Sequence, residues 1–281
     1  MRLRSLLFVP GDRPDRFPKA QASGADALIL DLEDSVTPER KAGARQAVAE
    51  WLSAPERRVP VLVRVNPLDS GFIEQDLAAI LRCQADGLVF PKCEGAHSIA
   101  ALLALADVDV PPILPIATET PAAVFGLGSY REVTSRLFGL TWGAEDLPAA
   151  IGALSSREPD GRYTPPYEMV RALMLFAAHA AGVPAIETVF PALDDADGLA
   201  AYVARGRRDG FTGMMALHPA QIAIINDGFT PSASEVARAR AIIAAFAAQP
   251  DAGVLRLDGK MIDRPHLIQA RRIVAAAQPE G

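Results

Sequence analysis

Eight short apolar runs, separated by helical patterns or polar loops, constrain the fold more than any other feature of the sequence. They lie at residues 5–9, 27–31, 61–65, 87–90, 113–117, 137–141, 185–190 and 213–216. Each run is apolar almost throughout, as expected for parallel strands buried on both faces. Amphipathic segments lie between them at 38–52, 71–83, 96–106, 166–181 and 196–208. Such alternation allows a doubly wound sheet or a closed barrel, and eight units favour the (β/α)8 TIM barrel.

The chain continues beyond the eighth run. We therefore predict a barrel domain at residues 1–232 and a C-terminal helical extension, or arm, at 233–281. An Ala-rich helix is expected at 234–248, a break at 249–257, where Pro250 and Gly253 occur, and a second helix within 258–277, entered through a short polar segment. This arm either caps its own barrel or reaches a neighbouring subunit.

Composition excludes several classes of partner. A net charge of −6 provides no electrostatic footprint for nucleic acid or for an anionic membrane surface. No apolar run approaches the roughly 20 residues that span a bilayer. Cys83 and Cys93 are too few for a disulfide framework, which indicates a reduced, cytoplasmic protein. The sequence contains neither a Gly-rich phosphate loop nor a GxSxG nucleophile elbow.

Polar residues gather where the predicted strands end, which is where barrel enzymes place their chemistry. Any one of them alone is more simply a solvated loop residue, but together they converge on one face of the barrel. They are Asp31, Glu33, Asp34, Arg64, Asn66, Lys92, Thr118, Glu119, Thr120, Glu145, Asp146, Glu187 and Thr188.

The type of these side chains indicates the chemistry of the site. Carboxylates from several strands, without clustered His or Cys, favour Mg²⁺ over zinc. Arg64 lies within the apolar segment VLVRVNP, where a charge must be paired. Its fork suits bidentate binding of a substrate carboxylate, and a salt bridge to Glu33 or Asp34 is the alternative.

The motifs around these residues resemble a known family. RSLLFVPGDRPDRFPKA, DALILDLEDSV, VRVNP, VFPKCE, PIATETP, LTWGAEDL, ETVFP and ALHPAQI occur in that order. They resemble the citrate lyase beta-subunit family, within the HpcH/HpaI aldolase superfamily that also contains malyl-CoA and citramalyl-CoA lyases. The resemblance covers nearly the whole chain.

The resemblance implies a TIM barrel that forms a homotrimer or hexamer and binds Mg²⁺ and a CoA thioester. It implies that Glu119 and Asp146 hold the metal and that Arg64 grips a substrate carboxylate. Glu33 and Asp34 would orient Arg64 or metal-bound water, Glu119 and Lys92 would also contact substrate, and Arg13, Arg16 and Lys19 would lie near the nucleotide end of CoA. The segment KMIDRPHLIQA resembles an arm that reaches a neighbour's site, with Asp263 as general acid or base. We expect Met261, Ile262 and Pro265 to pack on that neighbour.

The implied activity is that of a carbon–carbon lyase of the oxo-acid-lyase class. It would cleave, or form, a β-hydroxyacyl-CoA such as malyl-CoA, citramalyl-CoA or citryl-CoA, with a keto acid and acetyl-CoA as the other partners. These acyl groups differ by little more than a methyl or carboxymethyl group, so the sequence does not choose among them. The alternatives are a metal-dependent aldolase acting on free keto acids, a non-catalytic or complex-bound citrate lyase beta subunit, and a thioester hydrolase activity.

Overall fold

The chain folds around a ring of parallel strands. The computed structural model describes residues 3–55 and 57–277. The hydrogen-bonded order of the ring is β5-β4-β3-β2-β1-β8-β7-β6. Its members are β1 (Ser5–Pro10), β2 (Ala27–Asp31), β3 (Val61–Arg64), β4 (Gly87–Phe90), β5 (Ile113–Pro115), β6 (Leu140–Thr141), β7 (Ala185–Glu187) and β8 (Gly213–Ala216).

The two ends of this order meet and close the ring. Parallel bridges join Ile113 to Leu137 and Ile116 to Thr141. The amide of Phe138 donates to the Ile113 carbonyl at 2.7 Å, and the amide of Ala117 donates to the Thr141 carbonyl at 2.9 Å. The strands therefore form a nearly closed barrel, and the predicted TIM-barrel class is confirmed.

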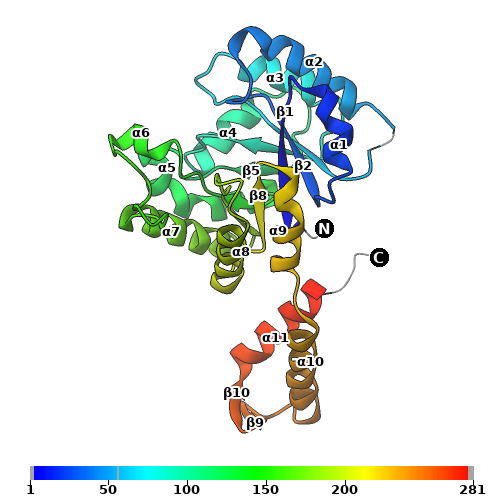
Figure 1. Ribbon diagram of the computed structural model, residues 1–281, viewed down its shortest axis with the longest axis vertical. Coiled ribbons are helices and arrows are strands. Elements are labelled where there is room, and N and C mark those ends of the chain that lie inside the picture. The colour runs from blue at the N-terminus through cyan, green and yellow to red at the C-terminus, as the bar shows by residue number, and fades with distance from the viewer. Residues whose placement is uncertain (1–2, 56, 278–281) are drawn as a thin grey trace. The chain divides into compact units, whose positions relative to one another are not determined.

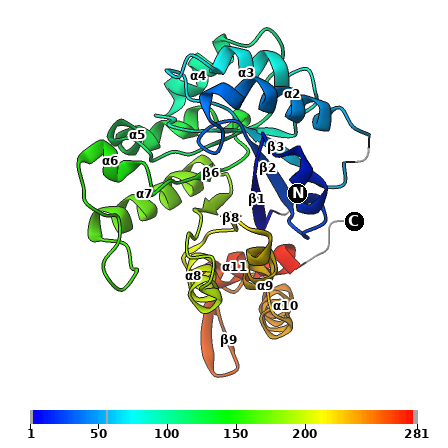
Figure 2. The ribbon, with the colours of Figure 1, turned by 45° about the horizontal axis from the view of Figure 1, so that its top comes forward.

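Helices cover the outside of the barrel (Figures 1 and 2). The longest begins with two prolines after Thr164 and ends at Gly182, whose φ of 71° suits the left-handed C-terminal position that glycine favours. The helices of this part of the chain are α1 (Phe17–Gln21), α2 (Lys41–Leu52), α3 (Ile73–Ile80), α4 (Ala96–Ala104), α5 (Pro121–Gly126), α6 (Leu147–Ile151), α7 (Pro165–Ala181), α8 (Ala196–Asp209) and α9 (Ile222–Phe229).

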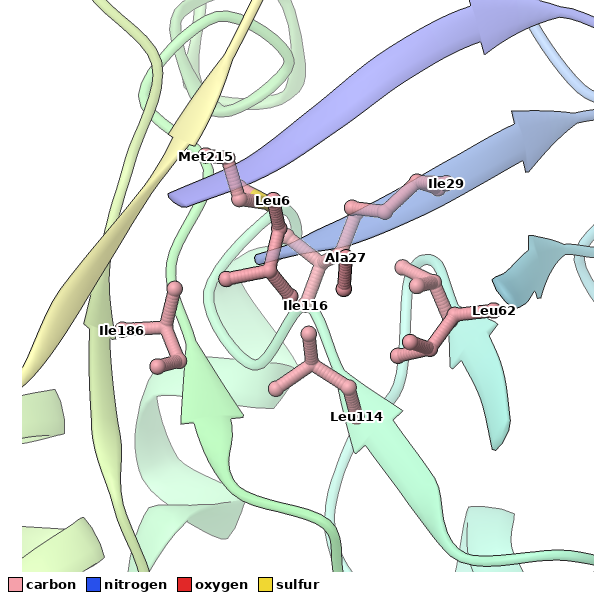
Figure 3. Packing of buried hydrophobic residues seen from close by; sticks show 9 residues of the cluster. Leu6, Ala27, Ile29, Leu62, Leu114, Ile116, Ile186 and Met215 are labelled. Carbon is pink, nitrogen blue, oxygen red and sulfur yellow. The ribbon is translucent and has the colours of Figure 1, made fainter. Parts of the chain in front are cut away.

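Aliphatic side chains from the strands fill the barrel interior. Leu6, Ile29, Leu62, Leu114 and Met215 belong to one buried cluster, to which most of the strands contribute (Figure 3). Alternate residues of a strand point to the same face, so every second apolar residue can meet its counterparts on the other strands. The interior is thus a packed core, and space for a ligand remains at the ends of the strands.

Residue contacts divide the chain into two compact units, and the division falls after Asn226. In the second unit, α10 (Ala233–Ala248) and α11 (Arg264–Ala277) flank the strands β9 (Val254–Leu257) and β10 (Lys260–Asp263). Ala239, Phe246, Ile262 and Leu267 are among the residues of its own apolar core. Within the described residues, no helix is long and apolar enough to cross a membrane.

The sequence analysis missed the hairpin formed by β9 and β10. Residues 249–257 were expected to be an irregular break, but Val254–Leu257 pairs with Lys260–Asp263 in antiparallel register. Asp258 and Gly259 have φ of 50° and 77°. Two positive φ values are what a two-residue Asp-Gly hairpin turn requires. This dipeptide was the signal that would have predicted the hairpin.

Candidate active site at the carboxyl ends of the strands

A cavity of about 330 Å³ lies where the barrel strands end. Acidic, basic and apolar side chains face it together, so it can accept a charged ligand that has an apolar part. Its charged lining consists of Arg16, Asp31, Asp34, Arg64, Glu119, Glu145 and Asp146, and its apolar lining includes Phe8, Ile116, Val189, Met215 and Leu217.

Arg64 is tied to the strand beside it. Its Nε donates to Asp31 Oδ1 and its Nη2 to Asp31 Oδ2, both at 2.7 Å. Its Nη1 lies 3.0 Å from Glu33 Oε2 and 3.7 Å from Asp34 Oδ2. Burial alone would lower the pKa of Arg64, but these carboxylates raise it above its ordinary value. Arg64 is therefore a fixed positive charge, held by Asp31 through Nε and Nη2 and by Glu33 through Nη1.

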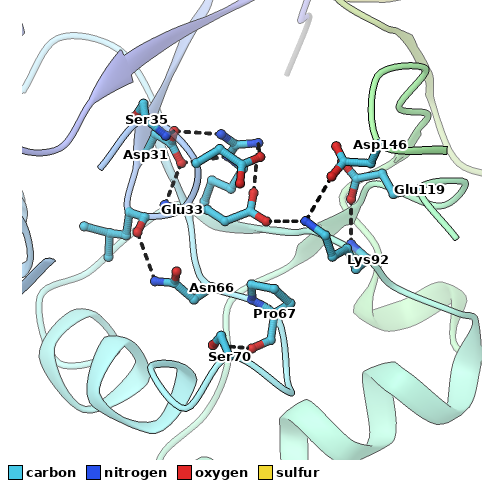
Figure 4. Close-up of polar contacts among 12 residues, drawn as sticks. Asp31, Glu33, Ser35, Asn66, Pro67, Ser70, Lys92, Glu119 and Asp146 are labelled. Atoms are coloured by element: carbon cyan, nitrogen blue, oxygen red, sulfur yellow. Dashed lines mark hydrogen bonds and ion pairs between the residues drawn. The ribbon is translucent and has the colours of Figure 1, made fainter. Parts of the chain in front are cut away.

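Lys92 links three carboxylates. Its Nζ lies 2.8 Å from Glu33 Oε1 and 3.3 Å from Asp146 Oδ1 (Figure 4). Its backbone amide donates to Glu119 Oε2 at 2.6 Å, and its φ of 49° is in the left-handed region that a lysine seldom adopts. Although burial opposes the charge, Glu33, Glu119 and Asp146 raise the pKa of Lys92 above its ordinary value. Lys92 thus supplies a permanent charge beside Asp146.

Glu119 is a strongly perturbed acid. Its side chain is buried, and burial raises its pKa to about 8, with further contributions from Glu33 and Asp146. Gly143 makes room for it, because a Cβ at that position would lie 2.7 Å from Glu119 Cγ. A positive charge placed next to this carboxylate would offset the cost of ionising it.

The donor set fits Mg²⁺. Among the described residues, no group of three or more His, Cys, Asp or Glu side chains is arranged to hold a metal ion. Mg²⁺ does not need such a cage, because it commonly takes one or two protein carboxylates and completes its shell with water and substrate oxygens. Glu119 and Asp146 line one cavity, and a metal cation beside the buried Glu119 would favour its ionised form further than the charge of Lys92 does.

Two further polar residues, Lys41 and Asp76, support the site through Asn66 and were missed in the sequence. The buried Lys41 donates to the carbonyls of Leu32 and Glu33 at 2.8 and 3.0 Å, and to Asn66 Oδ1 at 2.7 Å. Asn66 in turn donates to the buried Asp76. Lys41 occupies the helix face that also buries Ala44, a placement that helical spacing could have shown.

The remaining predicted residues are dispersed. Arg16 lines the cavity, whereas Arg13 is paired with Asp15 at 3.0 Å and Lys19 is exposed on α1. Asp263 lies in the second unit, where His266 Nδ1 is 2.5 Å from its Oδ1. The structure therefore brings together Arg64, Lys92, Glu33, Asp34, Glu119, Asp146 and Arg16 at the barrel.

This arrangement can be compared with known protein families. The model of the HpcH/HpaI aldolase/citrate lyase family matches residues 4–219, which include every residue that lines the cavity. The chain belongs to this family. Similar proteins align with nearly the whole chain, beyond the matched region as well.

Proteins similar to this chain include some named as citrate lyase subunits and some named as thioesterases. A citrate lyase subunit beta-like protein of Deinococcus radiodurans is 36% identical over 281 residues, which cover 97% of this chain and 96% of the relative. A (3S)-malyl-CoA thioesterase of Cereibacter sphaeroides is 34% identical over 98% of this chain and 94% of its own length.

A solved structure agrees with these matches. The protein CitE of Mycobacterium tuberculosis, crystallised with magnesium, acetoacetate and coenzyme A, superposes with a TM-score of 0.84 and 32% identity. The alignment covers 98% of each chain.

Proposed function

We propose that this protein is a Mg²⁺-dependent carbon–carbon lyase that acts on a β-hydroxyacyl-CoA thioester such as malyl-CoA, citramalyl-CoA or citryl-CoA. The observation that carries the proposal is the pair Glu119 and Asp146 on one cavity with Arg64. The Mycobacterium tuberculosis relative was crystallised with magnesium, a keto acid and coenzyme A, which are the ligands such a reaction uses.

The reaction is a retro-Claisen cleavage. The substrate hydroxyl loses its proton, and its oxygen forms a carbonyl as the bond to the thioester α-carbon breaks. The electron pair of that bond passes to the α-carbon as a thioester enolate, which takes up a proton to give acetyl-CoA. The oxidised carbinol fragment leaves as a keto acid. Mg²⁺ held by Glu119 and Asp146 would supply Lewis-acid polarisation of the hydroxyl and carboxylate oxygens.

The chain's own residues hold the substrate and its charges. Arg64 would meet the substrate carboxylate through the remaining N–H groups of Nη1 and Nη2, because Asp31 occupies the Nε edge and Glu33 takes one position on Nη1. Glu33 keeps Arg64 and Lys92 in place through one ion pair to each. Arg16, at the exposed part of the lining, suits the phosphates of CoA. Arg13 and Lys19 remain proposed contacts of the nucleotide.

Proton transfer is assigned to Asp263 of an adjacent subunit. The hydrogen bond from His266 holds the pKa of Asp263 below its ordinary value. Asp263 is therefore ionised at neutral pH, the form that can accept the hydroxyl proton, although the lowered pKa makes it a weaker base. Asp34, on the cavity lining, helps orient Arg64.

Thioester hydrolysis is a second candidate, favoured by the malyl-CoA thioesterase relative that matches nearly the whole chain. Water would attack the thioester carbonyl, and CoA thiol would leave. One assay separates the two activities. Malyl, citramalyl, β-methylmalyl and citryl thioesters are incubated with Mg²⁺, and keto acid, acyl-CoA product and free thiol are all measured.

We expect keto acid and acyl-CoA in equal amounts with little free thiol. Free thiol without keto acid would establish the hydrolase instead. Turnover of free keto acids without CoA would favour the aldolase alternative. Binding of the thioesters without any product would indicate a non-catalytic or complex-bound subunit.

A further inference from the structure

A second polar cluster lies outside the cavity, between strands β6 and β7 and helices α7 and α8. Its centre is Glu187, whose side chain is fully buried at the end of β7. Trp142 Nε1 and Tyr202 OH donate to Glu187 Oε1 at 2.5 and 2.9 Å. Arg171 Nε donates to Oε2 at 2.8 Å. The reaction proposed above uses none of these groups.

In this cluster Arg171 is paired with two carboxylates, and aromatic rings pack around them. Arg171 also donates to Asp209 Oδ2 at 2.8 Å, and its guanidinium lies 4.6 Å from the centroid of the Phe211 ring. Trp142 meets Tyr163 edge to face at 5.0 Å between centroids. A buried ion pair is seldom more stabilising than apolar residues of the same volume. What such a cluster can add is a fixed position for the groups that bind it.

Trp142 connects this cluster to the cavity. Residues 143–146, which follow it directly, all line the cavity, and Asp146 is among them. On the other side of the segment, Gly143 donates through its amide to Thr118 Oγ1, and its carbonyl accepts from the same hydroxyl, both at 3.1 Å. Gly143 also packs directly against Glu119. The segment 143–146, which carries Asp146, is thus held on one side by the hydrogen bond of Trp142 to Glu187 and on the other by the hydrogen bonds of Gly143 with Thr118.

We infer that Glu187 is a positioning residue, which holds Trp142 and thereby sets the segment 143–146, with Asp146, against Glu119. The consequence for Mg²⁺ rests on the proposed function, but the consequence for the segment does not. If Glu187 acts in this way, removing the Trp142 hydrogen bond must make the segment 143–146 more mobile. Removing the Tyr202 hydrogen bond to the same oxygen must leave its mobility unchanged.

The matched pair of variants is therefore Trp142→Phe and Tyr202→Phe, since each deletes one donor to Glu187 Oε1. Phe211→Leu controls for lost ring volume in the same cluster. Glu187→Gln keeps the volume and removes the charge, and it decides the matter if Trp142→Phe does not fold. The first readout is amide hydrogen exchange of residues 143–147 in metal-free protein, divided by that of residues 27–31 in β2. The second is Mg²⁺ affinity by calorimetry.

We expect Trp142→Phe and Glu187→Gln to accelerate exchange at 143–147 by about tenfold or more relative to β2, and to weaken Mg²⁺ binding by about 10–100-fold, the range typical of groups that orient metal ligands. Tyr202→Phe and Phe211→Leu should change both by less than about twofold on the same scale. Equal effects of Trp142→Phe and Tyr202→Phe on exchange would overturn the inference. Wild-type protein that fails to bind Mg²⁺ would overturn the metal proposal instead, while the exchange ratios would still decide the role of Glu187.

Discussion

At the scale of single residues, the geometry of Arg64 makes a specific prediction about substrate affinity. Lysine cannot reproduce the planar fork that meets Asp31 on one edge and a substrate carboxylate on another. A charged hydrogen bond contributes about 1.5–3 kcal/mol, so Arg64→Lys should lower kcat/KM by about tenfold to a hundredfold. Affinity for CoA alone, measured by calorimetry, should stay nearly unchanged. An equal loss of CoA affinity would mean that Arg64 holds the nucleotide or the fold.

Glu119 makes a prediction that couples stability to pH. Its pKa of about 8 in the folded protein lies above the ordinary value of 4.5. Between these values the unfolded chain is ionised and the folded protein holds the proton, so the wild-type free energy of unfolding falls as pH rises through this range. Glu119→Gln removes this pH-dependent loss of stability, because glutamine does not ionise. Without metal, the melting temperature of the variant relative to wild type should therefore be higher at pH 8 than at pH 5, although turnover with Mg²⁺ is abolished.

The exposed Glu74 on α3 provides the control for this experiment. Glu74→Gln should shift the melting temperature equally at both pH values, because the charge of an exposed carboxylate is solvated in both states. If Glu119→Gln behaves in the same way, Glu119 is ionised in the metal-free protein and the burial argument fails.

Removing the charge of Lys92 should increase the affinity of the site for a metal ion. Its ammonium, 3.3 Å from Asp146 Oδ1, competes with a metal ion for that carboxylate and repels it. Lys92→Met keeps the chain length and the backbone amide that binds Glu119. Repulsion between an ammonium and a metal ion in a half-buried site costs at least about 1.4 kcal/mol. Without it, Mg²⁺ should bind about tenfold more tightly by calorimetry. Weaker binding would indicate that Lys92 matters mainly for the shape of the site.

Residue-level reasoning from the sequence reached the types of side chain in this site but not all of their pairings. Arg64 needed a buried partner, and the ion pairs considered with Glu33 and Asp34 form, but the bidentate pair with Asp31 was not foreseen. The structure explains the difference, because Asp31 and Arg64 are register partners on β2 and β3. Strand register depends on the closed barrel, so a local pattern of apolar residues could not provide it.

At the scale of elements, the segments that follow β5 and β6 approach each other closely, and this predicts the effect of one added methyl group. A Cβ on Gly143 would lie 2.7 Å from Glu119 Cγ and 3.0 Å from its Oε1, so Gly143→Ala must displace the carboxylate. We expect Mg²⁺ affinity to fall by about tenfold or more. Gly128→Ala is the control, since a Cβ there meets nothing within 4 Å. Unchanged Mg²⁺ binding in Gly143→Ala would remove Glu119 from the metal site.

Strands and helices were predictable from the sequence to different degrees. Buried strands such as β2 appear as unbroken apolar runs, so their positions followed directly. The run at 137–141 forms a strand only at Leu140–Thr141. A short 3-10 helix, Thr134–Arg136, lies just before it, and Leu137 makes a single bridge. The β9–β10 hairpin was missed because it is mostly exposed and lacks an apolar run of comparable length.

At the scale of the whole molecule, the barrel was predictable because eight repeats admit few topologies, whereas the surface of the second unit was not. Ile262 was expected to pack on a neighbouring subunit, but it is buried in the core of its own unit. Met261 and Val254 on the same hairpin are 67% and 56% exposed. These two residues, rather than Ile262, are exposed apolar groups of the hairpin.

The proposed role of Asp263 can be tested by sharing sites between subunits. Asp263→Asn leaves the barrel intact, and Arg64→Ala leaves the second unit intact, so each protein alone should be nearly inactive. In a closed ring, each site would combine the barrel of one subunit with Asp263 of the next. Random exchange of equal amounts then gives about one quarter of the sites an intact Arg64 and an intact Asp263, because each has a probability of one half.

Mixtures should therefore recover roughly a quarter of wild-type turnover once mass spectrometry shows complete exchange. The control replaces Arg64→Ala by the double variant with Asp263→Asn, which can complete no site and should recover nothing. Exchange without recovery in the first mixture would place Asp263 in its own subunit's site or remove it from the chemistry. Full activity of Asp263→Asn alone would exclude it from proton transfer, and His266, its hydrogen-bonding neighbour, would lose its proposed influence as well.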